Sequence, residues 1–195
     1  NLQDSNGYTA LMIAARNGHE RVVDLLLRHG AEINLQDSDG LTALIAAALF
    51  NHPAVVRRLL RAGADTAART TSGKTALQLA KEKGHAECVE AFRQHIAEVT
   101  ASRREAAAGG AGGASSGEGA AGARAVASSG SLGNLSQEAV DAALQGDEAA
   151  LLSWLESGGR ANATCRMGDV SGITALMAAA QEGHERVVKL LLQRG

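Results

Sequence analysis

Histidine followed by glutamate is the pattern in this sequence that comes nearest to catalytic chemistry. The pair occurs at 19–20 and 184–185, and it begins like the zinc-binding helix of a metalloprotease, which needs a second histidine four residues after the first. Val23 and Val188 stand at that position, so the zinc motif is incomplete in both places. Four histidines share one repeated position, where we expect hydrogen bonding near a helix start rather than metal binding or general-base catalysis: His19, His52, His85 and His184.

The cysteines and the glycine-rich stretch add no catalytic site. Cys88 and Cys165 lie far apart in unlike surroundings, which favours neither a disulfide framework nor a metal cluster, and we expect Cys88 to be a small buried residue. The glycine-rich sequence at 109–113 does not follow a predicted strand, so it is not a phosphate-binding loop. We predict a protein that is not an enzyme, uses no metal or cofactor, and resides inside the cell, in the reducing cytoplasm.

Composition argues against two further classes of partner. The chain has 195 residues with 19 Lys and Arg against 21 Asp and Glu, and a formal net charge of −2 is no footprint of nucleic-acid binding. No apolar run approaches the roughly 20 residues that cross a membrane. Hydrophobic residues make up 45% of the chain but aromatic residues only 2%, so any core must be thin and locally packed.

A repeat with a period of 33 residues organises the sequence. The motif Asp-Ser-Asn-Gly-Tyr-Thr-Ala-Leu at 4–11 recurs as Asp-Ser-Asp-Gly-Leu-Thr-Ala-Leu at 37–44, and shorter copies stand at 72–77 and 171–176. Three of the copies continue into Gly-His or Asn-His, then Val-Val and a leucine-rich stretch. Self-similarity at such a period is typical of stacked repeat proteins.

Each copy is predicted to form two helices joined by a turn. Thr9 is suited to cap the first helix, and Gly18 is suited to end it in the left-handed conformation. The second helix spans about 19–28, where the apolar residues keep i, i+3 and i+4 spacing. Pairs of alanines in the first helices let neighbouring copies approach closely. Because one helix pair cannot bury its apolar face alone, the copies must stack.

These residues resemble the ankyrin repeat, whose pattern of Gly-x-Thr-Pro-Leu-His, Ala-Ala, Gly-His, Val-Val and Leu-Leu, then Gly-Ala-Asp, recurs every 33 residues. The match covers 1–99 and 169–195. The resemblance implies an all-α fold, a helix-turn-helix solenoid with short β-hairpin tips that binds other proteins. Two family positions differ, and we expect apolar packing to compensate. Alanine replaces the family's proline at Ala10, Ala43, Ala76 and Ala175, and other residues replace its histidine at Met12, Ile45, Gln78 and Met177.

Three segments follow from this pattern. Residues 1–99 hold three repeats, and the last has a more polar second helix, like a C-terminal cap. Residues 100–134, rich in Gly, Ala and Ser, are predicted to be a flexible linker, with extension of the preceding helix over 101–108 as the alternative. Residues 135–195 hold a weaker repeat at 135–159, like an N-terminal cap, and then one full repeat.

Two details of the last segment can be predicted. Trp154 aligns with Leu26, which favours a place in the core over a ligand site. Gly158 and Gly195 are 37 rather than 33 residues apart, so 162–169 contains a four-residue insertion at a hairpin tip.

The order of the segments is unusual, because a closing cap precedes the linker and an opening cap follows it. Gly195 is equivalent to Gly30, which is followed by residues 31–33 and then by Asn-Leu-Gln-Asp at 34–37. The chain begins with the same Asn-Leu-Gln-Asp at 1–4, so its end fits its beginning with about three residues missing. The chain is then either a circularly permuted single domain or a window of a larger tandem array, and the repeat phase does not choose between them. We predict that 135–195 stacks on the N-terminal side of 1–33.

A binding surface is the function that these features favour. In the family, hairpin tips and first helices form a concave face, and the resemblance assigns its contact positions here to twenty residues. We expect Tyr8, Leu41, Leu49 and Phe50 to be exposed as an apolar patch for another protein or peptide, with packing of Leu49 and Phe50 between repeats as the alternative. The rival function is self-association of repeat ends into homo-oligomers. The predicted contact residues are Ser5, Asn6, Tyr8, Arg16, Asn17, Ser38, Asp39, Leu41, Leu49, Phe50, Thr71, Ser72, Lys74, Glu82, Lys83, Val170, Ser171, Ile173, Gln181 and Glu182.

Overall fold

The computed structural model describes residues 1–109 and 135–195. Over these residues the chain forms ten helices and one antiparallel hairpin, and the predicted ankyrin-type helical solenoid is confirmed. The helices of the first part are α1 (Ala10–Asn17), α2 (Glu20–Arg28), α3 (Ala43–Leu49), α4 (Pro53–Arg61), α5 (Ala76–Glu82) and α6 (Ala86–Gly109). The second part holds α7 (Gln137–Gln145), α8 (Glu148–Glu156), β1 (Thr164–Met167), β2 (Val170–Thr174), α9 (Ala175–Glu182) and α10 (Glu185–Arg194).

A threonine caps the first helix of each full repeat, as the sequence predicts for Thr9. Its backbone is extended, and its hydroxyl accepts a hydrogen bond from the N–H three residues later, at 3.2 Å in α1. This bond satisfies an N–H group that has no partner within the helix. In α5 the bond is reciprocal, because the side chain of Gln78 accepts from the Thr75 N–H. The four capping residues are Thr9, Thr42, Thr75 and Thr174.

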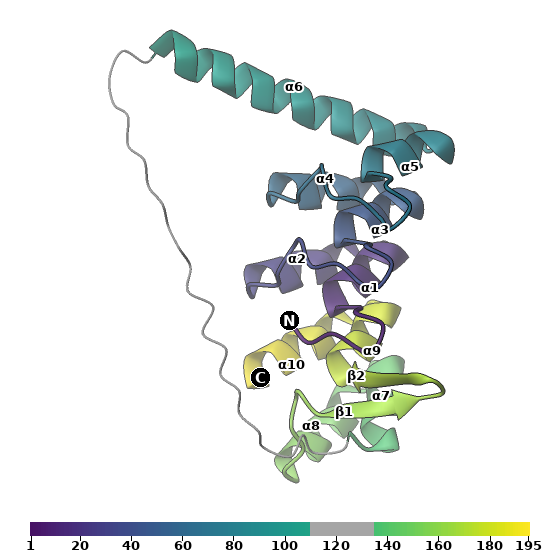
Figure 1. Ribbon diagram of the computed structural model, residues 1–195. Coiled ribbons are helices and arrows are strands. Elements are labelled where there is room, and N and C mark those ends of the chain that lie inside the picture. Colours follow the sequence, from purple (N-terminus) through teal and green to yellow (C-terminus); the bar gives the residue numbers. More distant parts are fainter. Residues whose placement is uncertain (110–134) are drawn as a thin grey trace, which may run out of the picture.

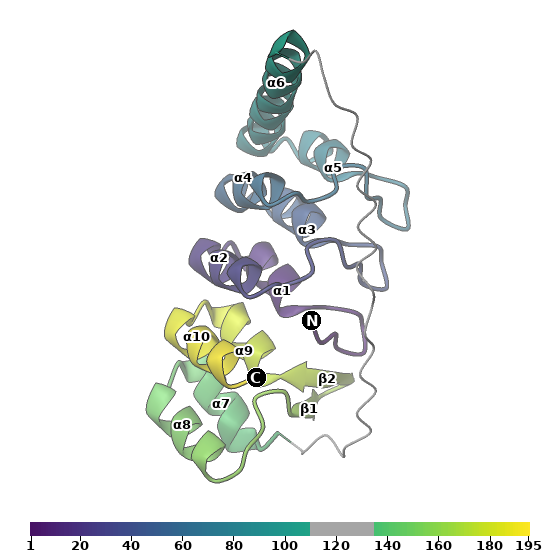
Figure 2. The same ribbon diagram turned by 90° about the vertical axis from the view of Figure 1, so that its left-hand side faces the viewer.

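The helix pairs stack in an order that differs from their order in the sequence (Figure 1). The first helices contact one another in the order α7, α9, α1, α3, α5, and the second helices in the order α8, α10, α2, α4, α6. Figure 2 shows these two layers, with the hairpin and the turns on the side of the first helices. Helices α9 and α10 thus pack on the N-terminal side of α1 and α2.

Small side chains allow the first helices to approach closely. Ala15 and Ala48 are completely buried between neighbouring repeats, at interior packing density, where a larger side chain would collide. Met12, Ile45 and Met177, which take the family's histidine position, are 2%, 1% and 2% exposed. Apolar packing therefore replaces that histidine at these three positions.

The same histidine hydrogen bond closes each junction between units. His52 donates from Nε2 to the carbonyl oxygen of Arg16, and His19 donates from Nε2 to that of Gln181, both at 2.8 Å. The second bond joins the turn between α1 and α2 to the last turn of α9, although its residues are 162 apart in the sequence. The predicted hydrogen-bonding role of these histidines is confirmed. The other two bonds run from His184 to Leu144 at 2.8 Å and, through Nδ1, from His85 to Ala48 at 3.0 Å.

A backbone hydrogen bond between neighbouring tips accompanies the histidine bond. The Ser38 N–H donates to the carbonyl of Asn6 at 3.0 Å, where the two repeats are consecutive in the sequence. The Ser5 N–H donates to the carbonyl of Ser171 at 2.8 Å, although these two repeats are not consecutive in the sequence. The junction between α9 and α1 therefore repeats the geometry of the covalently continuous junctions.

Helix α6 continues past residue 99 to Gly109. The first part of the 100–134 segment is therefore helical, which is the alternative that the sequence left open. Alanine, arginine and glutamate, which are common at 101–108, are strong helix formers. The rest of the predicted linker, 110–134, lies outside the described residues.

The 135–195 part contains two helix pairs and the hairpin. The expected cap repeat forms α7 and α8, and the insertion at 162–169 lies in the β1–β2 hairpin. Trp154 packs against the core but stays half-buried, whereas Leu151 on the same helix is completely buried. The ring of Trp154 lies against Gly159, which has no side chain to displace it.

Gly18 offers a test of the histidine junction. It ends α1 with a φ of 77°, and a Cβ there would overlap the ring of His52. We predict that Gly18→Ala destabilises the fold by about 2–3 kcal/mol, through left-handed strain and a displaced hydrogen bond. Gly30→Ala is the matched control, because Gly30 also has a φ of 77° but open space around it, and it should cost only about 1–2 kcal/mol.

Urea denaturation of the two variants measures this difference. Adding His52→Ala to both should make their losses of stability equal. If Gly18→Ala still costs more stability than Gly30→Ala in the His52→Ala background, the role given to His52 is contradicted.

Candidate functional site

A cleft of about 530 Å³ lies on the side of the first helices, where α1 meets α9 and the hairpin. We call it the inner cleft. Its lining combines apolar side chains with a few polar ones, which is the usual make-up of a binding site. Both parts of the chain contribute to it. The lining residues are Asp4, Asn6, Tyr8, Ile13, Arg16, Asn17, Leu144, Met167, Val170, Ile173, Met177, Ala178 and Gln181.

An aspartate fixes the turn that carries Tyr8 into the cleft. One carboxylate oxygen of Asp4 accepts hydrogen bonds from the N–H groups of Asn6 and Tyr8, at 2.9 and 2.8 Å. Aspartate at the start of a turn commonly makes this bond to its own backbone. Asp37 makes the equivalent pair of bonds in the next repeat. The sequence Asp-Ser-Asn/Asp-Gly thus sets the position of the residue that follows it.

The charge of Asp37 acts on the phenol of Tyr8 on this face. Tyr8 is half-buried, and the second carboxylate oxygen of Asp37 is buried without a hydrogen-bond partner among the residues described. Burial and the negative charge of Asp37 raise the pKa of Tyr8 above its ordinary value, while Arg16 acts in the opposite direction. The phenol therefore stays neutral at physiological pH and keeps its ability to donate a hydrogen bond.

Arg16 links the inner cleft to the next repeat. Its guanidinium lies 4.9 Å from the centre of the Phe50 ring, within the range of a cation–π interaction. Phe50 follows the end of α3 and is 45% exposed. The two side chains extend the surface beyond the cleft itself.

The structure brings some of the predicted contact residues together and leaves others apart. Seven of them line the inner cleft: Asn6, Tyr8, Arg16, Asn17, Val170, Ile173 and Gln181. Ser5 and Ser171 join the two tips beside it, and Glu182 accepts a hydrogen bond from Gln181. Farther along the stack lie Ser38, Asp39, Leu41, Leu49, Phe50, Thr71, Ser72, Lys74, Glu82 and Lys83, and among these Lys74 pairs with Glu82 at 2.6 Å.

The expected exposure of the apolar patch needs a correction. Of its four residues only Phe50 is exposed, whereas Tyr8, Leu41 and Leu49 are half-buried. Tyr8 and Leu41 pack against the core because the aspartate turns fold each of them back toward the following helix. The expectation of a contiguous exposed patch was wrong for these three side chains.

Sequence reasoning missed several residues of the cleft. Met167 at the hairpin is 39% exposed and lines the cleft, although the insertion was the only signal for it. Leu144 and Ile13 enter from α7 and α1, and their positions follow from stacking rather than from a motif. Met177 was recognised as a departure from the family pattern, and its place in the cleft depends on the packing of α9 against α1.

The remaining chemically active groups form no second site of this kind. In residues 1–109 and 135–195, there is no group of three or more His, Cys, Asp or Glu side chains that could hold a metal ion. Burial raises the pKa of the Cys88 and Cys165 thiols, which lowers their reactivity. Cys88 is completely buried, as expected. None of the described helices is both long and apolar enough to cross a membrane.

Comparison with protein families agrees with this architecture. A model of three successive ankyrin repeats matches residues 1–70 and 32–103, and a model of a single ankyrin repeat matches 171–195. The chain belongs to the ankyrin repeat family. No curated protein matches the sequence significantly. Ankyrin repeats are generally protein-protein interaction modules, and domains built from them are generally non-catalytic.

The ionisation of Tyr8 can be followed directly because it is the only tyrosine in the chain. Since its pKa is raised on folding, the phenol stabilises the fold below its unfolded pKa of about 10, and this contribution is lost as pH rises through the folded pKa. We predict an ultraviolet titration midpoint above that of the denatured chain. Asp37→Asn should lower the midpoint, and Asp65→Asn should leave it unchanged; equal effects would contradict the pairing.

Proposed function

We propose that this protein is a non-catalytic binding module whose inner cleft and the adjoining tips hold a segment of another protein. The observation that supports this most is the cleft of about 530 Å³, with apolar side chains from α1, α7, α9 and both strands of the hairpin together with polar groups. Protein interfaces combine an apolar centre with a polar rim in the same way. The partner's anchor is expected to be an apolar side chain that reaches Ile173 and Met177.

The proposed contact surface keeps the twenty residues predicted from the repeat positions and adds those that line the cleft. Phe50 and Met167 are its most exposed large apolar side chains, at 45% and 39%. Aromatic and methionine side chains are enriched in interface cores. Arg16 lies beside Phe50 and offers a donor to a partner carbonyl or carboxylate.

We also propose that 1–99 and 135–195 act as one module, with 100–134 as the connection between them. The histidine bond from His19 to Gln181 and the tip bond from Ser5 to Ser171 support this division. The inner cleft needs both parts, because Tyr8 and Ile173 come from different ends of the chain. The module is expected to act in the cytoplasm.

Self-association through exposed repeat ends has less support. It requires the end faces of α1–α2 and α9–α10 to be uncovered. Leu11, Leu26 and Leu191 on these helices are only 2%, 3% and 2% exposed within a single chain. Each end therefore already has a cover, and a second copy is not needed to bury it.

An affinity experiment tests the proposed cleft. The intact chain is used to capture partners, and each partner identified by mass spectrometry is measured by calorimetry against single variants. We predict that Phe50→Ala and Met167→Ala each weaken binding by about 1–3 kcal/mol, as expected of anchors in an interface. Both side chains are partly exposed, so the melting temperature should change little.

Lys81→Ala, an exposed change on α5 outside the proposed surface, is the control and should leave affinity unchanged. A verified partner that binds both apolar variants as tightly as the intact chain would refute the inner cleft as the binding site.

A further inference from the structure

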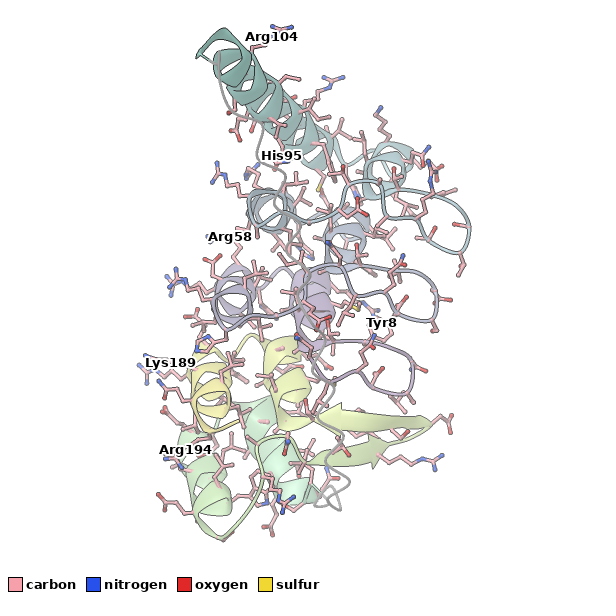
Figure 3. The ribbon with its side chains drawn as sticks, turned by 60° about the vertical axis from the view of Figure 1, so that its left-hand side comes forward. Tyr8, Arg58, His95, Arg104, Lys189 and Arg194 are labelled. Carbon is pink, nitrogen blue, oxygen red and sulfur yellow. The ribbon has the colours of Figure 1, made fainter. Side chains whose placement is uncertain are left out.

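The outer layer of helices carries a charge pattern that the inner cleft does not use. Helices α2, α4 and α10 carry eight arginine and lysine side chains against three carboxylates, although the whole chain has a formal net charge of −2. Figure 3 shows Arg58, Lys189 and Arg194 along the outer helices, away from Tyr8. Positive charge is therefore concentrated on these three helices, whereas carboxylates outnumber basic residues on α8 and α6 at the two ends of the same layer.

A shallow groove of about 280 Å³ lies between α2 and α10. We call it the outer groove. Arg28 lines it from α2, and Arg186 and Lys189 line it from α10. All three side chains belong to exposed residues. Leu25, half-buried, adds an apolar contact surface between the charges.

The carboxylates of the outer groove already have partners. Glu185 pairs with Arg21 at 3.5 Å, and Asp24 pairs with Arg58. Arg58 also pairs with Glu20 at 3.0 Å. All three carboxylates of α2, α4 and α10 therefore have an ion-pair partner.

Four cations line the groove, and Arg21 is the one that pairs with Glu185. The other three, Arg28, Arg186 and Lys189, have no carboxylate within ion-pair distance in the part of the chain that the structure describes. Like charges repel one another, so an anion bound in a groove lined by these cations would be favourable. The position of Arg28 and Arg194 near helix C-termini accounts for part of the basic bias, because cations stabilise that end of a helix. Arg186 and Lys189 lie in the first half of α10, where this reason does not apply.

We propose that the outer groove binds an acidic segment of a protein partner. The carboxylates of such a segment would pair with Arg28, Arg186 and Lys189, and the methylene groups of its glutamates would cover Leu25. A peptide also offers backbone N–H groups, which Asp24 and Glu185 can accept. A phosphate of a nucleic acid or a lipid offers anionic oxygens to the cations but carries no N–H group for these two carboxylates.

This second surface makes the protein a bivalent scaffold. It does not depend on occupation of the inner cleft, because the groove lies on the opposite layer of helices. It does depend on α10 lying beside α2, which come from opposite ends of the chain. A variant that weakens binding at the outer groove alone should keep binding at the inner cleft. Undocking of the two parts would instead abolish binding at both surfaces, so the two failures can be told apart.

Fluorescence anisotropy of a labelled (Glu-Gly-Ser)4 peptide tests the proposal on the full chain. We expect binding that weakens with added salt, as for any charge-assisted complex. Arg28→Gln/Lys189→Gln should weaken the affinity by about tenfold or more. Lys81→Gln/Arg160→Gln is the matched control, because it removes the same charge from exposed positions outside the groove and should leave the affinity unchanged. Circular dichroism verifies that all variants are folded.

Three results would overturn the proposal. Equal losses in the two double variants would mean that the peptide responds to net charge alone. Tighter binding of an oligouridylate than of the peptide would assign the groove to nucleic acid. Salt-sensitive dimerisation of the intact chain in sedimentation, abolished by Arg28→Gln/Lys189→Gln, would make a second copy of the chain the occupant.

Discussion

Each pair of helices in this chain has an apolar face that only a neighbouring pair can cover. The first helices supply alanines such as Ala15 and Ala48, and the second helices supply leucines such as Leu26 and Leu59, all buried between units. In a repeat array, stability comes from these contacts between neighbours. The complementary ends of 1–99 and 135–195 therefore cover each other, although the chain does not connect them directly. Both the inner cleft and the outer groove lie at the junction that this contact creates.

Much of the fold could be predicted because the recurring positions of the repeat hold residues that act on the backbone close to them. Thr9 caps a helix through its own hydroxyl, and Gly18 ends it with a positive φ, so neither position depends on distant contacts. The spacing of Val22, Val23 and Leu26 defines the buried face of α2 in the same local way. These signals recur at a fixed period, which makes each of them a check on the others.

Features that depend on contacts between units were harder to predict. The half-burial of Tyr8 results from the turn made by Asp4 together with packing on the core, whereas the contact position that the family pattern assigns to Tyr8 implied exposure. Met167 reaches the inner cleft because the hairpin lies beside the turn that precedes α1, which no local pattern indicates. The three unpartnered cations of the outer groove are recognisable only once the ion pairs of Asp24 and Glu185 are known. The contact surface from the family pattern therefore includes seven residues of the proposed cleft and omits several of its apolar residues.

If the two parts of one chain dock to form a single stack, a cross-link at their junction should form within the chain. Ser5→Cys and Ser171→Cys place thiols at positions joined by a backbone hydrogen bond of 2.8 Å, in a background where Cys88 and Cys165 are replaced by alanine. At low protein concentration, mild oxidation should give an intrachain disulfide, detected by mass spectrometry and by a shift in gel mobility. The pair Ser5→Cys/Ser72→Cys, two repeats apart, should not cross-link within the chain. Absence of the Ser5→Cys/Ser171→Cys disulfide, or its formation only between chains, would show that the two parts do not stack within one chain.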